Sequence, residues 1–221
     1  MGGRNKQLLM LEGKTVLRRS VEAFVSLREV REILVVCRRE DLEPYREVLA
    51  GLPEDKVRLL PAGGSTRQQS VENALAFLAP DTDCIAIHDG ARPLVRREDI
   101  EKAFQTAQEK GSALLGVFTR DTIKVVRDGR VEASPDRSTL FLAQTPQVFR
   151  REDYLAAMAE ARARGLDFTD DAQLFEQTGR PVFAVEGHAD NLKITSPEDL
   201  PLAEGCLRAR RNCDAENRTG I

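Results

Sequence analysis

Short apolar segments rich in β-branched residues alternate along this chain with longer segments of helical periodicity. Ile33–Val36 is continuously apolar, as expected of a strand that is buried on both faces. The segment 15–27 instead places Val16, Val21 and Phe24 on one helical face. Such alternation is typical of a mostly parallel sheet covered by helices. The sequence therefore predicts an α/β domain.

After a first helix, the predicted elements follow the order βαβαβ and continue as one domain over residues 1–211. Strands are expected at 32–37, 57–60, 83–88, 113–118 and 182–185. Helices are expected at 15–27, 41–50, 68–78, 97–110, 151–164, 170–177 and 197–210. A chain of 221 residues with 41% hydrophobic residues can build one sizeable core. Residues 212–221 are expected to form a polar, frayed tail.

Asp128-Gly129 joins two extended segments, 122–126 and 130–133. Asp-Gly between such segments is typical of a β-hairpin turn. We expect an arm over about residues 121–144 that leaves the sheet. Arms of this kind often dock on a second subunit.

The charge balance excludes some partners. With 33 Lys and Arg against 36 Asp and Glu, the net charge of −3 does not favour nonspecific binding to nucleic acid or to an anionic membrane. No segment approaches the ~20 apolar residues of a membrane span and no signal peptide opens the chain, so the cytoplasm is expected. The four cysteines lack metal-ligand spacing and are expected to be small buried thiols.

The loop Gly63–Ser70 lies between a predicted strand and a predicted helix. Free backbone N–H groups at a helix N-terminus can bind an anion or a base edge. Arg67 and Ser70 would add a guanidinium group and a hydroxyl to this loop. A tight turn with Ser or Thr as the helix N-cap is the alternative interpretation.

Asp89 and Arg92 lie at the carboxyl end of the predicted strand 83–88, the edge at which open α/β sheets bind ligands. An aspartate there can hold Mg²⁺ or a substrate hydroxyl, and an arginine can bind phosphate with two hydrogen bonds. A turn pair closed by Pro93 explains this motif equally well. Lys193 lies in an extended segment, where it is either turned inward onto an anion or solvated.

Weaker signals are open to simpler interpretations. The segments 121–124 and 144–147 carry little information alone, and Thr169-Asp170-Asp171 opens a helix, so capping is a sufficient explanation for it. His88 and His188 are not expected to form a catalytic pair, because no Ser or Cys nucleophile motif accompanies them.

Taken in order, seven segments resemble the 2-C-methyl-D-erythritol 4-phosphate cytidylyltransferase family over essentially the whole chain. They are residues 5–7, 63–70, 88–93, 121–124, 145–147, 169–171 and 191–195. The resemblance implies a Rossmann-like nucleotidyltransferase fold and a homodimer with exchanged arms. It also implies the transfer of CMP from CTP to methylerythritol phosphate, with release of pyrophosphate, and Mg²⁺ or another divalent cation as cofactor.

The resemblance also implies which side chains form the site. It assigns catalysis to Lys6, Arg137 and Lys193, nucleotide binding to Gly64, Arg67 and Ser70, and substrate binding to Asp89, Arg92, Thr122 and Thr169. Asp89 is also the implied metal ligand, Lys6 would stabilise charge on the α-phosphate, and Arg137 would act across the dimer interface. Nucleotidyl transfer depends on positioning and charge neutralisation, so no general base is expected.

The sequence departs from the family at its beginning. A first strand, central in the sheet, and a glycine-rich loop precede the family residue that aligns with Met1. We expect the natural chain to continue upstream of Met1. The alternatives are a homologue that keeps binding or dimer contacts without transfer and, within the enzymes, a ribitol 5-phosphate cytidylyltransferase.

Overall fold

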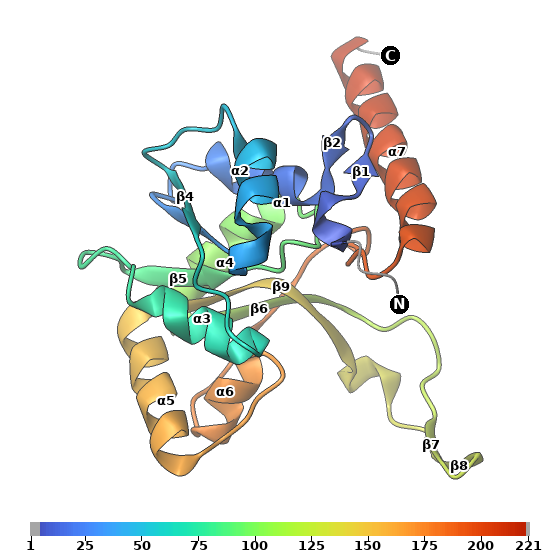
Figure 1. Cartoon of the computed structure of the whole chain (residues 1–221). Helices are drawn as coiled ribbons and strands as arrows, with labels where there is room; N and C mark the ends of the chain where they lie inside the picture. Colours follow the sequence, from blue (N-terminus) through green and yellow to red (C-terminus); the bar gives the residue numbers. More distant parts are fainter. Residues whose placement is uncertain (1–4, 220–221) are drawn as a thin grey trace.

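Helices cover a central mixed sheet in the computed structural model, which describes residues 5–219 and side chains as far as Cys213 (Figure 1). The four-stranded sheet has the order β10-β6-β9-β5. Its strands are β5 (Cys84–Ile87), β6 (Ser112–Phe118), β9 (Phe141–Arg150) and β10 (Ala184–Glu186). β10 pairs in parallel with β6, whereas β9 is antiparallel to both β5 and β6. A separate parallel pair consists of β3 (Ile33–Val36) and β4 (Val57–Leu60).

Seven α-helices lie within the described residues and cover both faces of the sheet. They are α1 (Val16–Val25), α2 (Leu42–Leu49), α3 (Arg67–Leu75), α4 (Arg97–Lys110), α5 (Arg151–Arg164), α6 (Asp171–Gln177) and α7 (Leu200–Thr219). On one face, Phe24 of α1 and Ile100 of α4 pack with Leu115 of β6. On the other, Phe149 packs with Tyr154 and the rest of α5 and α6. This arrangement confirms the predicted α/β class.

Local capping explains where several helices begin and end. The side chains of Thr15, Thr66 and Asp170 each accept a backbone hydrogen bond from the first turn of α1, α3 and α6. Gly111 and Gly165 end α4 and α5 in the left-handed conformation, with φ of 94° and 63°. These signals agree with the boundaries that the sequence predicts for α4 and α5.

Two predictions differ most from the structure. The predicted arm ends near residue 144 and no strand is predicted after it, but β9 runs from Phe141 to Arg150 and lies between β5 and β6. Pro146 concealed it, because proline is rarely found inside a strand. The expected end of the last helix at Arg210 is also wrong, since α7 continues to Thr219 and the expected tail from Asn212 is helical that far. No Gly or Pro interrupts residues 206–219.

The predicted hairpin is present and stands away from the body of the molecule (Figure 1). β7 (Val125–Arg127) pairs with β8 (Arg130–Ala133), and Asp128 and Gly129 have φ of 48° and 76°, as a tight primed turn requires. Its apolar side chains, including Val126 and Val131, are exposed. No helix within the described residues is long and apolar enough to cross a membrane.

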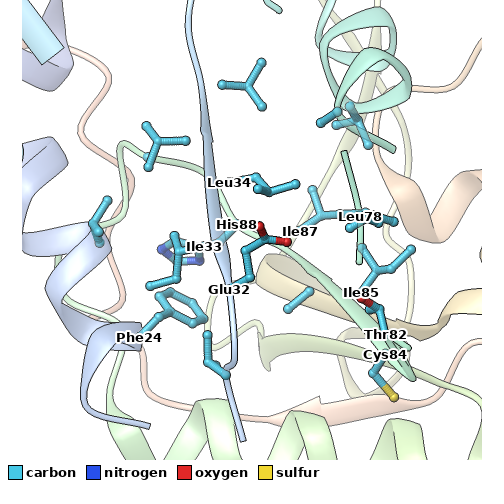
Figure 2. A pocket seen from close by; sticks show the side chains of 18 of the residues that line it. Phe24, Glu32, Ile33, Leu34, Leu78, Thr82, Cys84, Ile85, Ile87 and His88 are labelled. Atoms are coloured by element: carbon cyan, nitrogen blue, oxygen red, sulfur yellow. The ribbon is translucent and has the colours of Figure 1, made fainter. Parts of the chain in front are cut away.

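A cavity of about 570 Å³ separates β3 from β5. Figure 2 shows Leu34 of β3 and Ile85 and Ile87 of β5 among the side chains around it. Within residues 5–219, β3 pairs only with β4 and β5 pairs only with β9. The facing edges of β3 and β5 therefore have no strand partner in this part of the chain.

Gly116 lies at an irregularity in the β6–β9 pairing, where the two strands approach closely. A Cβ on Gly116 would lie 2.5 Å from the backbone oxygen of Leu142. We predict that Gly116→Ala lowers the free energy of unfolding by about 1–3 kcal/mol, because overpacking forces the strands apart. Gly205→Ala is the control, since open space surrounds this position in α7 and alanine favours a helix there. Denaturant unfolding of both variants checks this, and equal stability of the two would contradict it.

Candidate active site

The carboxylate of Asp89 lies just beyond β5 and has three cationic neighbours. Nζ of Lys193 lies 2.8 Å from its Oδ2, Nε of Arg67 lies 3.6 Å from its Oδ1, and Nε of Arg92 lies 3.8 Å from its Oδ2. We call these four residues the Asp89 cluster. The structure thus brings together four of the predicted site residues, and Lys193 is turned toward an anion.

Three separate segments carry the Asp89 cluster. Arg67 opens α3, whose N-cap Thr66 fixes the first turn. Asp89 and Arg92 share a turn that the 2.9 Å hydrogen bond from the Arg92 N–H to the Asp89 carbonyl closes. The segment with Lys193 is held against this turn, because the N–H of Ile194 donates to the carbonyl of Ala91 at 2.8 Å.

The surrounding charges decide how Asp89 ionises. Burial alone would raise its pKa, but the hydrogen bond and charge of Lys193, together with the charge of Arg67, outweigh burial and lower the pKa below its usual value. Burial lowers the pKa of Arg92, although arginine stays protonated at neutral pH. Asp89 is therefore a stable anion in a strongly cationic site.

Asp171 provides a second carboxylate beneath Arg67. Its Oδ2 lies 2.7 Å from Nη2 of Arg67, and its Oδ1 accepts a 2.7 Å hydrogen bond from the hydroxyl of Tyr154. Asp171 is fully buried, and burial followed by the charge of Asp171 raises the pKa of Tyr154 well above its usual value. The motif 169–171 predicts a helix cap and, through the resemblance, a hydroxyl from Thr169, but it does not predict the Arg67–Asp171 pair. Three cations, Arg67, Arg92 and Lys193, thus face two carboxylates, which leaves a net positive charge for an anionic ligand.

Arg92 is held mainly by backbone oxygen atoms. Its Nη1 donates to the carbonyl of Asn191 at 2.7 Å and its Nη2 to the carbonyl of Ala143 at 3.4 Å. Nε is buried and has no hydrogen-bond partner among the described residues. A buried donor without a partner costs free energy, which a phosphate oxygen at this position would recover.

The predicted loop Gly63–Ser70 is held by its own side chains. The hydroxyl of Ser70 accepts a 2.9 Å hydrogen bond from the N–H of Gly64 and donates to the carbonyl of Thr66 at 2.9 Å. A second cavity, of about 390 Å³, lies beside Gly64 and is also lined by Arg38 and Arg39. Ser70 therefore has a structural role in this loop. Arg38 and Arg39, which no sequence motif indicated, line the same cavity as Gly64.

Lys6 belongs to η1 (Lys6–Leu8), which packs on the turn after Asp89. Asn5 caps η1 and donates to the hydroxyl of Tyr45 at 3.0 Å. A Cβ on Gly90 would lie 2.9 Å from Nε2 of Gln7, so this segment and the turn after Asp89 are in close contact. The side chain of Gln7, the neighbour of Lys6 in the chain, thus lies against the turn that follows Asp89.

Three predicted residues lie elsewhere in the single chain. Arg137, in η3 (Arg137–Thr139), and Thr122 are exposed on the arm. Thr169 is exposed and donates from its N–H and hydroxyl to Oε1 of Gln173 at 2.7 and 3.2 Å, which agrees with the capping interpretation. Among the described residues, none of these three has a hydrogen bond or ion pair with the Asp89 cluster.

The implied metal ligand is Asp89. No group of three or more His, Cys, Asp or Glu side chains in the described part of the chain is placed to hold a metal ion. Mg²⁺ is commonly held by one or two carboxylates together with substrate phosphates. A single carboxylate beside a phosphate-binding cluster fits Mg²⁺ that arrives with a triphosphate.

The fold and the cluster fit a protein that acts on phosphorylated ligands. Cations gather around one carboxylate at the edge where open α/β sheets bind ligands, as charge neutralisation in phosphoryl and nucleotidyl transfer requires. The profile of the 2-C-methyl-D-erythritol 4-phosphate cytidylyltransferase family matches residues 1–209. The chain therefore belongs to this family of nucleotidyltransferase enzymes.

Individual relatives agree with this assignment. The chain is 42% identical to the 2-C-methyl-D-erythritol 4-phosphate cytidylyltransferase of Solibacter usitatus, over 94% of this chain and 86% of that protein. It is 44% identical to that of Geobacter metallireducens, over 93% and 90%. The crystal structure of the Thermus thermophilus protein of the same name has a TM-score of 0.79 and 35% identity, with 92% and 94% of the two chains covered. The crystal structure of 4-diphosphocytidyl-2C-methyl-D-erythritol synthase from Anaerococcus prevotii has a TM-score of 0.84 and 28% identity, with 91% and 93% covered.

The burial of His88 predicts how the free energy of unfolding depends on pH. Burial lowers the pKa of His88 from 6.5 to about 4, so the unfolded chain takes up a proton near pH 6.5 that the folded chain accepts only near pH 4. We predict that the free energy of unfolding falls as pH drops from about 6.5 to about 4, by at most about 1.4 kcal/mol per pH unit from this group. His88→Gln should lose this part of the pH dependence in denaturant titrations. If the free energy of unfolding of His88→Gln depended on pH as it does in the wild type, this would contradict a neutral, buried His88.

Proposed function

We propose that this chain transfers CMP from CTP to 2-C-methyl-D-erythritol 4-phosphate, with the Asp89 cluster at the reaction centre. The observation that carries the proposal is the meeting of Arg67, Arg92 and Lys193 around Asp89 at the ligand-binding edge of the sheet. Family membership supports the choice of both substrates over ribitol 5-phosphate and over a protein that only binds.

The proposed reaction needs no general base. An oxygen of the substrate phosphate, which is already an anion, forms a bond to the α-phosphorus of CTP. The bond from the α-phosphorus to the bridging oxygen breaks, and pyrophosphate leaves with that electron pair. The site holds the two anions together and neutralises the charge that develops between them. The excess of cations over carboxylates in the Asp89 cluster supports this role.

Lys193 and Arg92 are proposed to bind the methylerythritol phosphate. The side chain of Lys193 is 42% exposed, so a ligand can reach Nζ, which would exchange the carboxylate of Asp89 for a phosphate oxygen. The unpartnered Nε of Arg92 would donate to the same group. Asp89 would then be free to bind a substrate hydroxyl or Mg²⁺, which when bound neutralises phosphate charge.

The nucleotide is proposed to lie along the loop 63–70. Gly64 and Arg67 would contact the cytidine, while Ser70 keeps the loop in shape through the N–H of Gly64. Lys6 would stabilise charge on the α-phosphate, which is supported by the contact between η1 and the turn after Asp89.

The arm is proposed to complete the site of a second subunit in a homodimer. Arg137 and Thr122 lie on the arm without a contact to the Asp89 cluster of their own chain among the described residues, and Thr169 would offer its hydroxyl from the body. Exposed valines on the hairpin support docking on another apolar surface. The cytoplasm is our proposed location.

Pyrophosphate release tests the proposed function. We predict release by the 221-residue chain with CTP, Mg²⁺ and methylerythritol phosphate, and none with ribitol 5-phosphate. Lys193→Ala should reduce turnover by about 10²–10³-fold, because a charged group that contacts the reacting phosphate is lost. Lys102→Ala, at an exposed position in α4, is the matched control and should keep full turnover.

Calorimetric binding separates the remaining outcomes. Binding of both substrates without turnover would favour the protein that only binds, and release with ribitol 5-phosphate alone would favour the sister activity. Full turnover of Lys193→Ala would contradict the site.

Mixed dimers test the arm. We predict that chains with Arg137→Ala and chains with Lys193→Ala are each inactive and that mixing them restores part of the activity, because one site in each mixed dimer is then intact. Mixing Lys193→Ala with Asp89→Ala should restore nothing, since both changes lie in the body of the chain. Failure of the first mixture to recover activity would indicate that each site is built from one subunit.

A further inference from the structure

Both ring nitrogens of His88 make hydrogen bonds to the walls of the candidate site. Nε2 lies 3.0 Å from the carbonyl oxygen of Arg92, and Nδ1 lies 3.0 Å from Oγ1 of Thr145 in β9. The same Oγ1 accepts a 3.0 Å hydrogen bond from the N–H of Asp89. One imidazole therefore connects the backbone of Asp89, through Thr145, with the backbone of Arg92.

These partners fix where the protons lie. A carbonyl oxygen only accepts, so Nε2 of His88 must carry a hydrogen toward Arg92. Oγ1 of Thr145 accepts from the N–H of Asp89 and can donate its own hydrogen to Nδ1. The neutral imidazole with its proton on Nε2 therefore satisfies every bond of this relay.

The surroundings of His88 hold the ring in place, and neither ring nitrogen is left free to react with a substrate. The ring of Phe24 lies 4.9 Å from the imidazole, centroid to centroid, and Figure 2 shows the two side by side. The carbonyl of Gly90, on the same turn, accepts a 3.0 Å hydrogen bond from the hydroxyl of Ser20 in α1. His188 is engaged elsewhere, with Nδ1 2.9 Å from the carboxylate of Asp99. Both ring nitrogens of His88 are thus engaged by protein groups, Nε2 by the carbonyl of Arg92 and Nδ1 by the hydroxyl of Thr145, rather than by a ligand.

We propose that His88, as the neutral Nε2–H imidazole, is a positioning residue that sets the separation of Asp89 and Arg92 through Thr145. This inference rests on the proposed function, since the two side chains that it positions are the ones assigned to the substrate phosphate and the metal. His88 itself touches no reacting atom. Replacing His88 is therefore expected to weaken substrate binding more than it slows the chemical step.

Two isosteric variants separate the two ring contacts. Asn at position 88 offers an oxygen where Nδ1 lies and keeps the bond to Thr145, whereas Gln offers an N–H where Nε2 lies and keeps the bond to Arg92. His88→Asn and His88→Gln should each raise the KM for methylerythritol phosphate on the order of tenfold, as expected for one lost hydrogen bond, and His88→Ala should raise it further. Thr145→Val should resemble His88→Ala, and Thr145→Ser should restore the wild-type KM. Thermal unfolding is measured alongside, because a merely structural role would lower the amount of folded protein and leave KM unchanged.

Proton-detected ¹⁵N NMR of the imidazoles tests the inference without catalysis. The chain has 2 histidines, so a His188→Ala variant assigns the signals of His88. We expect the proton on Nε2 and an unprotonated Nδ1 at neutral pH. A proton on Nδ1, or an unchanged KM in folded His88→Ala, would overturn the proposal. An inactive wild-type chain with the expected tautomer would instead count against the proposed function alone.

Discussion

The carboxylate of Asp89, shared by Lys193, Arg67 and Arg92, is the interaction on which the arrangement of the site depends. The three cations come from α3, from the turn after β5 and from the segment after β10, which are far apart in sequence. Without a common anion, like charges this close would repel one another and each would lose a counterion. Asp89 therefore keeps the site assembled, and an incoming phosphate can replace it as the partner of Lys193.

The cavity between β3 and β5 extends to this site, since Arg67 and Asp89 are among the residues that line it. It is lined by apolar residues of both strands and also by His88 and Gln7, which contact or flank the turn that carries Asp89. Backbone groups at the facing strand edges have no strand partner within residues 5–219, and unpaired buried backbone groups are costly. Among the described residues, the β3–β4 pair is therefore joined to the four-stranded sheet by helices rather than by hydrogen bonds between strands.

Much of the fold was predictable because its signals are local. β4 and α4 have their predicted bounds, since an apolar run and a helical period leave little ambiguity. β9 was not predictable, because Pro146 argues against a strand and only the tertiary structure shows how the sheet accommodates it. In the site, the positions of Asp89 and Lys193 followed from motifs, but the pairing of Arg67 with Asp171 did not. Both residues also fit a helix N-terminus, and only the fold shows that they meet.

The most direct test of this account is a crystal structure of the chain with methylerythritol phosphate bound. The account predicts that the phosphate lies against Arg92 Nε and that Nζ of Lys193 has moved from Asp89 to a phosphate oxygen, while the turn from His88 to Arg92 stays in place. A phosphate bound elsewhere, with the 2.8 Å pair between Lys193 and Asp89 intact, would contradict the claim that this cluster is the substrate site.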